Sequence, residues 1–236
     1  MTASSTRPVR LLVLGMLGIM AFLAACGSSN PTNGEASKSA VQIFSDAKSA
    51  TESASSVHIS GRITSGSDKV GLDFVDSSGR SGGTISDNGA TFQIILSGKT
   101  VYLKGSEATM SKLSGSAAAG QLLGSKWLQT TTGNKDFGGL AGLFNLPNLI
   151  ANIQPTGTLH KGPVTTIDGQ SVVALTDSTR KGTLYVADSG RPYMIELVGG
   201  PGEAGMITFD QYSSARPPAI PSGAINLDQL EGGSGA

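Results

Sequence analysis

The sequence predicts an α+β fold, in which a strongly curved antiparallel sheet wraps over an N-terminal helix and a mid-chain helical insert. Three patterns predict it. A segment with helical periodicity, residues 40–53, is followed by segments in which apolar and polar residues alternate. The alternation stops between Ser106 and Pro155, where apolar residues cluster, and then resumes. Because a sheet with one polar face must cover its other face, we expect the helix and the insert to pack on it.

Residues 1–25 have the pattern of a lipoprotein signal peptide. Arg7 and Arg10 precede an uncharged run, residues 11–25, that is too short for a comfortable membrane span and has the length of a signal-peptide core. The four letters LAAC that end at Cys26 resemble the bacterial lipobox. This resemblance implies that Cys26 receives a diacylglyceryl group and becomes the first residue after cleavage. A buried free cysteine or an uncleaved N-terminal helix is the alternative.

Lipidation at Cys26 predicts a protein anchored to the extracytoplasmic face of the cell membrane. Two acyl chains, such as palmitate, hold a protein on a bilayer far better than one, at about 0.8 kcal/mol per buried CH₂. Residues 26–39, rich in Gly, Ser and Asn, are then the lipidated cysteine and a flexible tether. Because the sequence has a single cysteine, which is committed to lipid, no internal disulfide is expected.

The composition fits one near-neutral domain. The 236-residue chain carries 17 basic and 17 acidic residues, and 15 basic residues remain without Arg7 and Arg10. These charges are scattered, which argues against a nucleic-acid partner. The length left after the signal peptide suits a single domain. We expect this domain over residues 40–220, followed by a flexible C-terminal tail, residues 221–236, because the segment 213–236 has too many Pro and Gly for regular structure.

The first helix has a clear start signal. Ser39 and Gln42, three residues apart, form a capping-box pattern. The helical period then places Val41, Phe44 and Ala47 near one face, which we expect to pack on the sheet.

Tight turns join the predicted strands, so successive strands should be antiparallel neighbours. The clearest turn signals are Asn-Gly at 88–89 and Asp-Gly at 168–169. Two short helices are predicted in the insert, at 117–123 and 148–153, the second after Pro147. The predicted strands cover residues 57–65, 69–76, 82–87, 90–97 and 100–105 before the insert, and 157–162, 170–177, 182–188, 191–199 and 205–212 after it.

Motifs that suggest chemistry lack the structural context that the chemistry needs. The G-x-G-x-x-G match at 200–205 precedes a predicted strand, not a helix, and the Gly-Lys-Thr at 98–100 is a hairpin turn. Ser81 matches a nucleophile-elbow pattern, but a strand follows it. His58 and His160 have no carboxylate immediately beside them. We therefore expect no enzyme activity, no cofactor and no metal site.

Two groups of apolar residues are the candidate binding site. One group alternates along the first set of strands and is predicted to form a dry inner wall, and the other lies in the insert and is predicted to cover it. The wall comprises Val70, Leu72, Phe74, Phe92, Ile94, Leu96 and Leu103, and the cover comprises Leu140, Leu143, Phe144, Leu146, Leu149 and Ile150. Either these residues complete a core, or they line a cavity for an apolar ligand.

The order of these parts resembles the LppX/LprG-type lipoproteins of actinobacteria, which are similar in fold to LolA and LolB. After the lipobox come SASSVHISG, GKTVYLKG, KWLQ, LPNLIANI and GTLYVADSGRPYMIEL, and the likeness covers most of residues 40–215. The resemblance implies a half-open antiparallel barrel around helices. It also implies an apolar cavity, which in some members takes lipid or glycolipid acyl chains. No position carries over as a known ligand contact.

These observations lead to two functional hypotheses. The first is a non-enzymatic envelope lipoprotein that binds a lipid or other apolar ligand between sheet and helices, for transfer or sensing. The alternative is an interaction or sensor module of the same fold, with a filled core, that contacts another envelope protein. A hydrolase is disfavoured because no acid, base and nucleophile can be assembled around Ser81.

Overall fold

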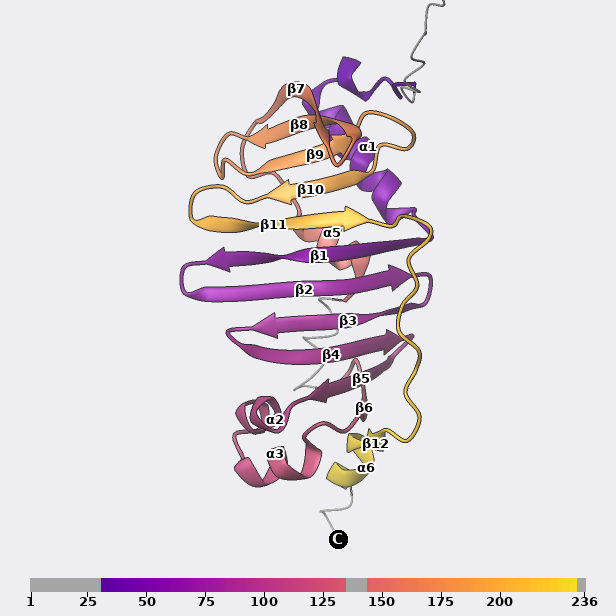
Figure 1. The fold of residues 1–236 in the computed structure, drawn as a ribbon, viewed down its shortest axis with the longest axis vertical. Helices are drawn as coiled ribbons and strands as arrows, with labels where there is room; N and C mark the ends of the chain where they lie inside the picture. The colour runs from indigo at the N-terminus through magenta and orange to yellow at the C-terminus, as the bar shows by residue number, and fades with distance from the viewer. Residues whose placement is uncertain (1–30, 135–143, 233–236) are drawn as a thin grey trace, which may run out of the picture.

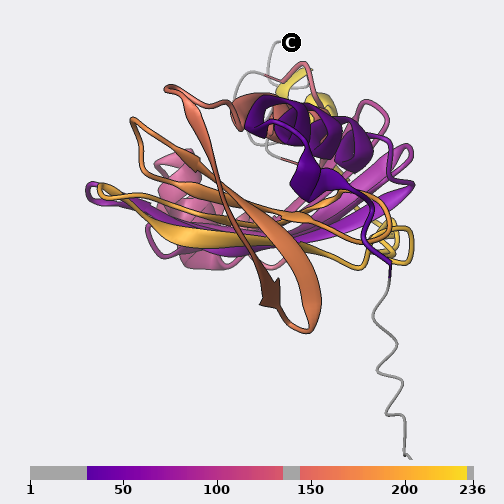
Figure 2. The same ribbon diagram turned by 90° about the horizontal axis from the view of Figure 1, so that it is seen from above.

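The computed structural model describes residues 31–134 and 144–232. These residues form a twelve-stranded sheet that curves around α1 (Figures 1 and 2). The predicted α+β class and the curved sheet are confirmed. In chain order the elements are η1 (Glu35–Ser37), α1 (Ala40–Glu52), β1 (Ser56–Ser65), β2 (Asp68–Ser77), β3 (Arg80–Asp87), β4 (Ala90–Ser97), β5 (Thr100–Gly105), α2 (Glu107–Ser114), α3 (Ala117–Leu123), β6 (Leu128–Thr131), α5 (Leu146–Asn152), β7 (Leu159–Ile167), β8 (Gln170–Asp177), β9 (Thr183–Ala187), β10 (Met194–Val198), β11 (Glu203–Asp210), β12 (Ile225–Asn226) and α6 (Leu227–Gly232).

The sheet joins two meanders at a seam between β1 and β11. The strand order is β12-β6-β5-β4-β3-β2-β1-β11-β10-β9-β8-β7. At the seam the register runs from His58 opposite Asp210 to Ser65 opposite Glu203. Neighbouring strands are antiparallel, as predicted, except that β12 runs parallel to β6. The seam therefore places residues from the start and end of the domain side by side.

Helix α1 begins where the capping box predicts. The Ser39 backbone N–H donates to the Gln42 side chain over 3.1 Å, and the Gln42 N–H donates to Ser39 Oγ over 3.4 Å. The predicted apolar face was wrong at Val41, which is 68% exposed, because the sheet-facing stripe instead begins at Ile43, which is fully buried. The stripe continues through Ala47, also fully buried.

The main core lies between the sheet, α1 and α5. Phe144, which precedes α5, inserts against Phe74 of β2, with ring centroids 5.0 Å apart. Asn145 caps α5 by accepting a hydrogen bond from the Asn148 N–H over 3.0 Å. The members that are at most 2% exposed are Ile43, Ala47, Val57, Ile59, Phe74, Ile85, Ile94, Val101, Leu103, Phe144, Leu146, Ile150, Val173, Leu175, Val186, Met194 and Phe209.

Residues 225–232, which lie within the expected flexible tail, form a short strand and a helix. Residues 225–226 pair with β6, and α6 follows directly. Leu227 is buried with Met110 and Leu128 in a small second core. These apolar contacts outweigh the local Pro and Gly content, which is why composition alone was misleading here.

The expected tether is also docked on the domain from Thr32 onward. Thr32 forms a β-bridge with Ser189, and the Asn33 side chain donates to the Ala187 carbonyl over 3.0 Å. Lys161 Nζ donates to the carbonyls of residues 36 and 38 over 2.7 and 2.9 Å. Cys26 and the predicted signal peptide lie outside the described residues. Within residues 31–134 and 144–232, no helix has the length and apolar character needed to cross a bilayer.

Candidate functional site

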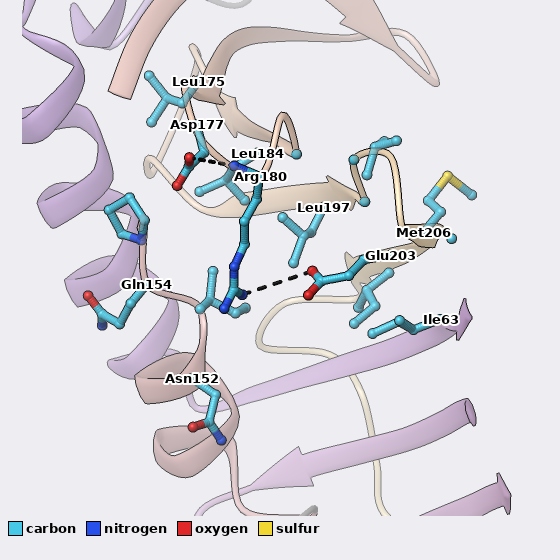
Figure 3. Close-up of a pocket in the computed structure, with 18 of the residues that line it drawn as sticks. Ile63, Asn152, Gln154, Leu175, Asp177, Arg180, Leu184, Leu197, Glu203 and Met206 are labelled. Carbon is cyan, nitrogen blue, oxygen red and sulfur yellow. Dashed lines mark hydrogen bonds and ion pairs between the residues drawn. The ribbon is translucent and has the colours of Figure 1, made fainter. Parts of the chain in front are cut away.

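A cavity of about 260 Å³ lies between the second meander and the chain that leaves α5 (Figure 3). Leu149 of α5 and Ile153, at the end of that helix, line one side together with Phe44 of α1. The sheet supplies the opposite side. Its lining residues there are mainly aliphatic, and they include Leu159, Leu175, Leu184, Leu197 and Ile207.

The sheet side of the cavity is an unbroken cross-strand row. The residues directly opposite one another on β8, β9, β10 and β11 are Leu175, Leu184, Leu197 and Ile207. Directly opposed residues share one face of a sheet, with Cβ atoms about 5 Å apart. Strand alternation therefore makes one continuous apolar strip from four short sequence segments.

The rim of the cavity is charged. Arg180, on the turn between β8 and β9, reaches across the cavity toward Glu203 at the start of β11 (Figure 3). Arg180 Nη1 lies 3.9 Å from Glu203 Oε2, and the two side chains are 53% and 49% exposed. An ion pair of this length and exposure contributes little to stability. Arg180 is therefore free to exchange Glu203 for another anion at small cost.

Asp177 fixes the turn that carries Arg180. Its buried carboxylate accepts hydrogen bonds from the backbone N–H groups of Thr156, Gly157, Thr179 and Arg180 over 2.6 to 3.2 Å. Burial by itself raises the pKa of Asp177, but these four donors outweigh it and hold the pKa well below the usual range. Asp177 thus stays ionised and ties the two loops at the cavity rim together.

Most of the predicted wall and cover residues lie in or against the hydrophobic core and do not line the cavity. Phe74, Phe92, Ile94 and Leu103 are buried in the core cluster. Val70, Leu72 and Leu96 pack against it, half-buried. Of the predicted cover, Phe144, Leu146 and Ile150 are buried in the same cluster, Leu149 lines the cavity, and Leu140 and Leu143 lie outside the described residues.

Sequence reasoning missed the sheet side of the cavity. The segments containing Leu175, Leu184 and Leu197 were correctly predicted as strands, but the wall was assigned to the first meander alone. The available signal was the aliphatic alternation in these strands. Its inward face becomes evident only when the strand order is known.

A second hollow, of about 300 Å³, opens beside the filled core. It lies near the β2–β3 turn and the start of α5, and Glu52, Asp76 and Arg80 are among its lining residues. Burial raises the pKa of Asp76 to about 6, although a hydrogen bond from the backbone of Leu146 acts in the opposite direction. Unlike the first cavity, this hollow is lined by many polar side chains.

His58 has two carboxylate partners, contrary to the sequence prediction. Its Nδ1 lies 2.7 Å from Asp210 Oδ1, and its Nε2 lies 3.1 Å from Asp73 Oδ1. Burial lowers the pKa of His58, but the two carboxylates together raise it above its ordinary value. The seam creates this cluster because it brings Asp210 of β11 next to His58 of β1.

The other motifs keep the contexts that were predicted for them. Residues 200–205 overlap the start of strand β11, which begins at Glu203, and Ser81 is a buried residue within β3. In the part of the chain that the structure describes, no group of three or more His, Cys, Asp or Glu side chains is arranged to hold a metal ion.

Comparison with known proteins identifies the fold. No protein-family model and no curated protein matches the sequence. Among solved structures, the chain is similar to LprF from Mycobacterium bovis, with 15% identity, a TM-score of 0.51, and coverage of 78% of this chain and 97% of LprF. The lipoprotein LppX of Mycobacterium tuberculosis (14% identity, TM-score 0.47, 75% and 96% covered) and a LolA superfamily protein from Nitrosomonas europaea (13%, 0.25, 82% and 100%) also match. The likeness to LprF confirms the fold predicted from the sequence resemblance.

Proposed function

We propose, from the LprF-like fold and the apolar cavity, that this chain is a lipid-anchored, non-catalytic envelope lipoprotein that binds a lipid or another apolar ligand for transfer or sensing. The observation that carries the proposal is the row of aliphatic side chains on β8 to β11, which faces a cavity of about 260 Å³. In a filled core these side chains would contact other side chains across that space. Ligand binding would provide those contacts.

Apolar burial would supply the affinity. Each CH₂ group moved from water into the cavity contributes about 0.8 kcal/mol. Polar contacts are then needed only at the rim, to orient the ligand. Among the residues predicted from the sequence to contact a ligand, Leu149 lines the cavity and would contact the apolar part of the ligand.

Native mass spectrometry tests the binding. Residues 27–236 contain every residue that the structure describes, and this form would be purified without detergent. We expect a bound apolar molecule, or uptake of added phospholipid, as a discrete mass increase. A chain that is always empty and takes up no lipid contradicts the proposal.

Anchoring needs a separate test, because Cys26 lies outside the described residues. We expect metabolic palmitate labelling of the full chain in a bacterial host, and loss of the label in Cys26→Ala. Label retained by Cys26→Ala would remove the anchor from the proposal and leave the cavity unaffected.

One observation favours the alternative, an interaction module with a filled core. The centre of the first meander is filled, with Phe74 and Phe144 in contact at 5.0 Å between ring centroids. A partner protein would then dock outside the sheet, for example along the edge strand β7. The same mass spectrometry separates the two functions, because this alternative predicts an empty chain.

A further inference from the structure

We infer that the cavity selects amphiphiles with a single acyl chain and an anionic head group, which Arg180 holds at the rim. This inference rests on the proposed function, because it names the class of apolar ligand that the cavity takes. Three observations carry it: the volume of the cavity, the aliphatic interior, and the position of one exchangeable cation at the opening.

The volume limits the apolar part of the ligand. An aliphatic cavity of about 150 Å³ binds benzene, a ligand of six carbons. At the same ratio, 260 Å³ holds about ten carbons. One alkyl chain of that length fills the cavity, whereas the two long chains of a membrane phospholipid do not fit. The interior presents aliphatic groups along its length, which suits a flexible chain better than a polar ring.

The rim carries two carboxylates, Asp177 and Glu203, and one guanidinium, Arg180, so the preference for an anion depends on which of these groups can exchange its partner. The carboxylate of Asp177 is already occupied by four backbone donors, so it offers little to a cationic head group. Arg180 has five N–H donors in its guanidinium, and it pairs with Glu203 at 3.9 Å. A carboxylate or phosphate on the ligand can take two parallel hydrogen bonds from this group. The exchange costs only the weak pair with Glu203.

Isothermal titration calorimetry on residues 27–236 tests the ligand class with four ten-carbon probes and one two-chain lipid. The probes are decanoate, decyl phosphate, decanol, decylammonium and didecanoyl phosphatidate. We expect decanoate or decyl phosphate to bind most tightly, and the better of the two identifies the head group as carboxylate or phosphate. A second series uses straight-chain carboxylates of increasing length. From six to ten carbons, each added CH₂ should tighten their binding about fourfold, and chains longer than ten carbons should gain nothing more.

Charge variants test the role of Arg180. Arg180→Gln should weaken decanoate binding about tenfold and decanol binding much less. Lys181→Gln removes the same charge from the same turn at a position that does not line the cavity, and serves as the matched control. Glu203→Gln removes the competing carboxylate, so it should tighten decanoate binding about two- to fivefold.

A variant with a larger side chain tests whether the probes bind in this cavity. Ile153→Trp should fill the cavity and weaken every probe, whereas Leu123→Trp, a half-buried residue of α3 far from the cavity, should not (Figure 1). Circular dichroism checks that both variants fold. If Ile153→Trp is unstable, the charge variants decide, because Arg180 and Glu203 are half-exposed.

The outcomes separate this inference from the proposed function. Equal binding of decanol and decanoate, or tightest binding of decylammonium, overturns the anion preference. Binding of didecanoyl phosphatidate with the affinity gained from both chains overturns the single-chain limit and keeps the proposed function. If none of the probes binds and native mass spectrometry also finds an empty chain, both fail.

Discussion

The two meanders share one face of one sheet, yet an apolar cavity lies over the second, whereas the hollow at the edge of the first is lined by many polar side chains. A single row of opposed positions crosses both. It runs through Leu175, Leu184, Leu197, Ile207, Gly61, Leu72, Ile85 and Phe92. Over the first meander, Phe144 packs on Phe74. Over the second, the chain at 152–155 lines the cavity without filling it. The comparison shows that the covering segment, not the sheet, decides where a cavity forms.

The largest expected effect tests this difference directly. Phe144→Ala should lower the free energy of unfolding by about 4 kcal/mol, because it removes a fully buried aromatic ring from a filled core. Leu197→Ala, in the second meander, should cost about 1 kcal/mol, because Leu197 is only partly buried beside the cavity. Urea unfolding measures both. Equal losses would mean that the second meander is as well packed as the first.

An intermediate effect is expected at the seam between the halves. Gly61 lies there with φ of +156°, and a Cβ would fall 2.1 Å from the Met206 carbonyl oxygen and 2.7 Å from the Ile207 Cα. Gly61→Ala should therefore cost about 3 kcal/mol, since strand β11 must move away. Gly133→Ala, whose nearest contact would be 3.7 Å away, is the control. A seam that tolerates alanine would show that the two meanders are not held rigidly together.

The smallest effect concerns the polar hollow at the edge of the first meander. The pKa of Asp76 is raised to about 6, above its ordinary value near 4. The folded state therefore binds more protons between about pH 4 and pH 6, so stability falls as the pH rises through this window. Asp76→Asn keeps an acceptor for the Leu146 N–H and removes the buried charge. At pH 7 it should stabilise the fold by about 1 kcal/mol after solvent screening.

Urea unfolding at pH 4.5 and pH 7 checks the Asp76 prediction, with exposed Asp87→Asn as the control. The groups that share the hollow, Glu52 and Arg80, remain in both variants. If Asp76→Asn and the unaltered chain lose stability in parallel between these pH values, another group causes the dependence.

Local signals in the sequence predicted most of the fold. Alternation, the Asn-Gly turn at 88–89 and the capping box at Ser39 each depend on neighbouring residues, and the corresponding strands and helix form as predicted. Helix α2 and the short strands β6 and β12 were missed. A strand of two to four residues has too few positions to show alternation, and its pairing depends on distant partners.

The site could not be predicted because it depends on strand order. The sequence gives no local sign that β11 lies beside β1, so the carboxylate of Asp210 next to His58 was not foreseen. The cavity was missed for the same reason, since its row joins residues from four separate strands. Leu149 was found because its own segment was recognisably an apolar helix.

The docked segment at Thr32 sets how far the domain can stand from a membrane. Under the proposed anchoring at Cys26, six residue steps separate the lipid from the β-bridge to Ser189, which allows at most about 20 Å. That bridge sits on the β7–β9 side of the sheet, the same half that contains the cavity. Ser189 follows the end of β9, whereas Arg180 and Glu203 at the rim precede β9 and begin β11, so the attachment and the opening lie at opposite ends of these strands. A short tether would therefore restrict tumbling of the domain while the opening of the cavity pointed away from the point of attachment.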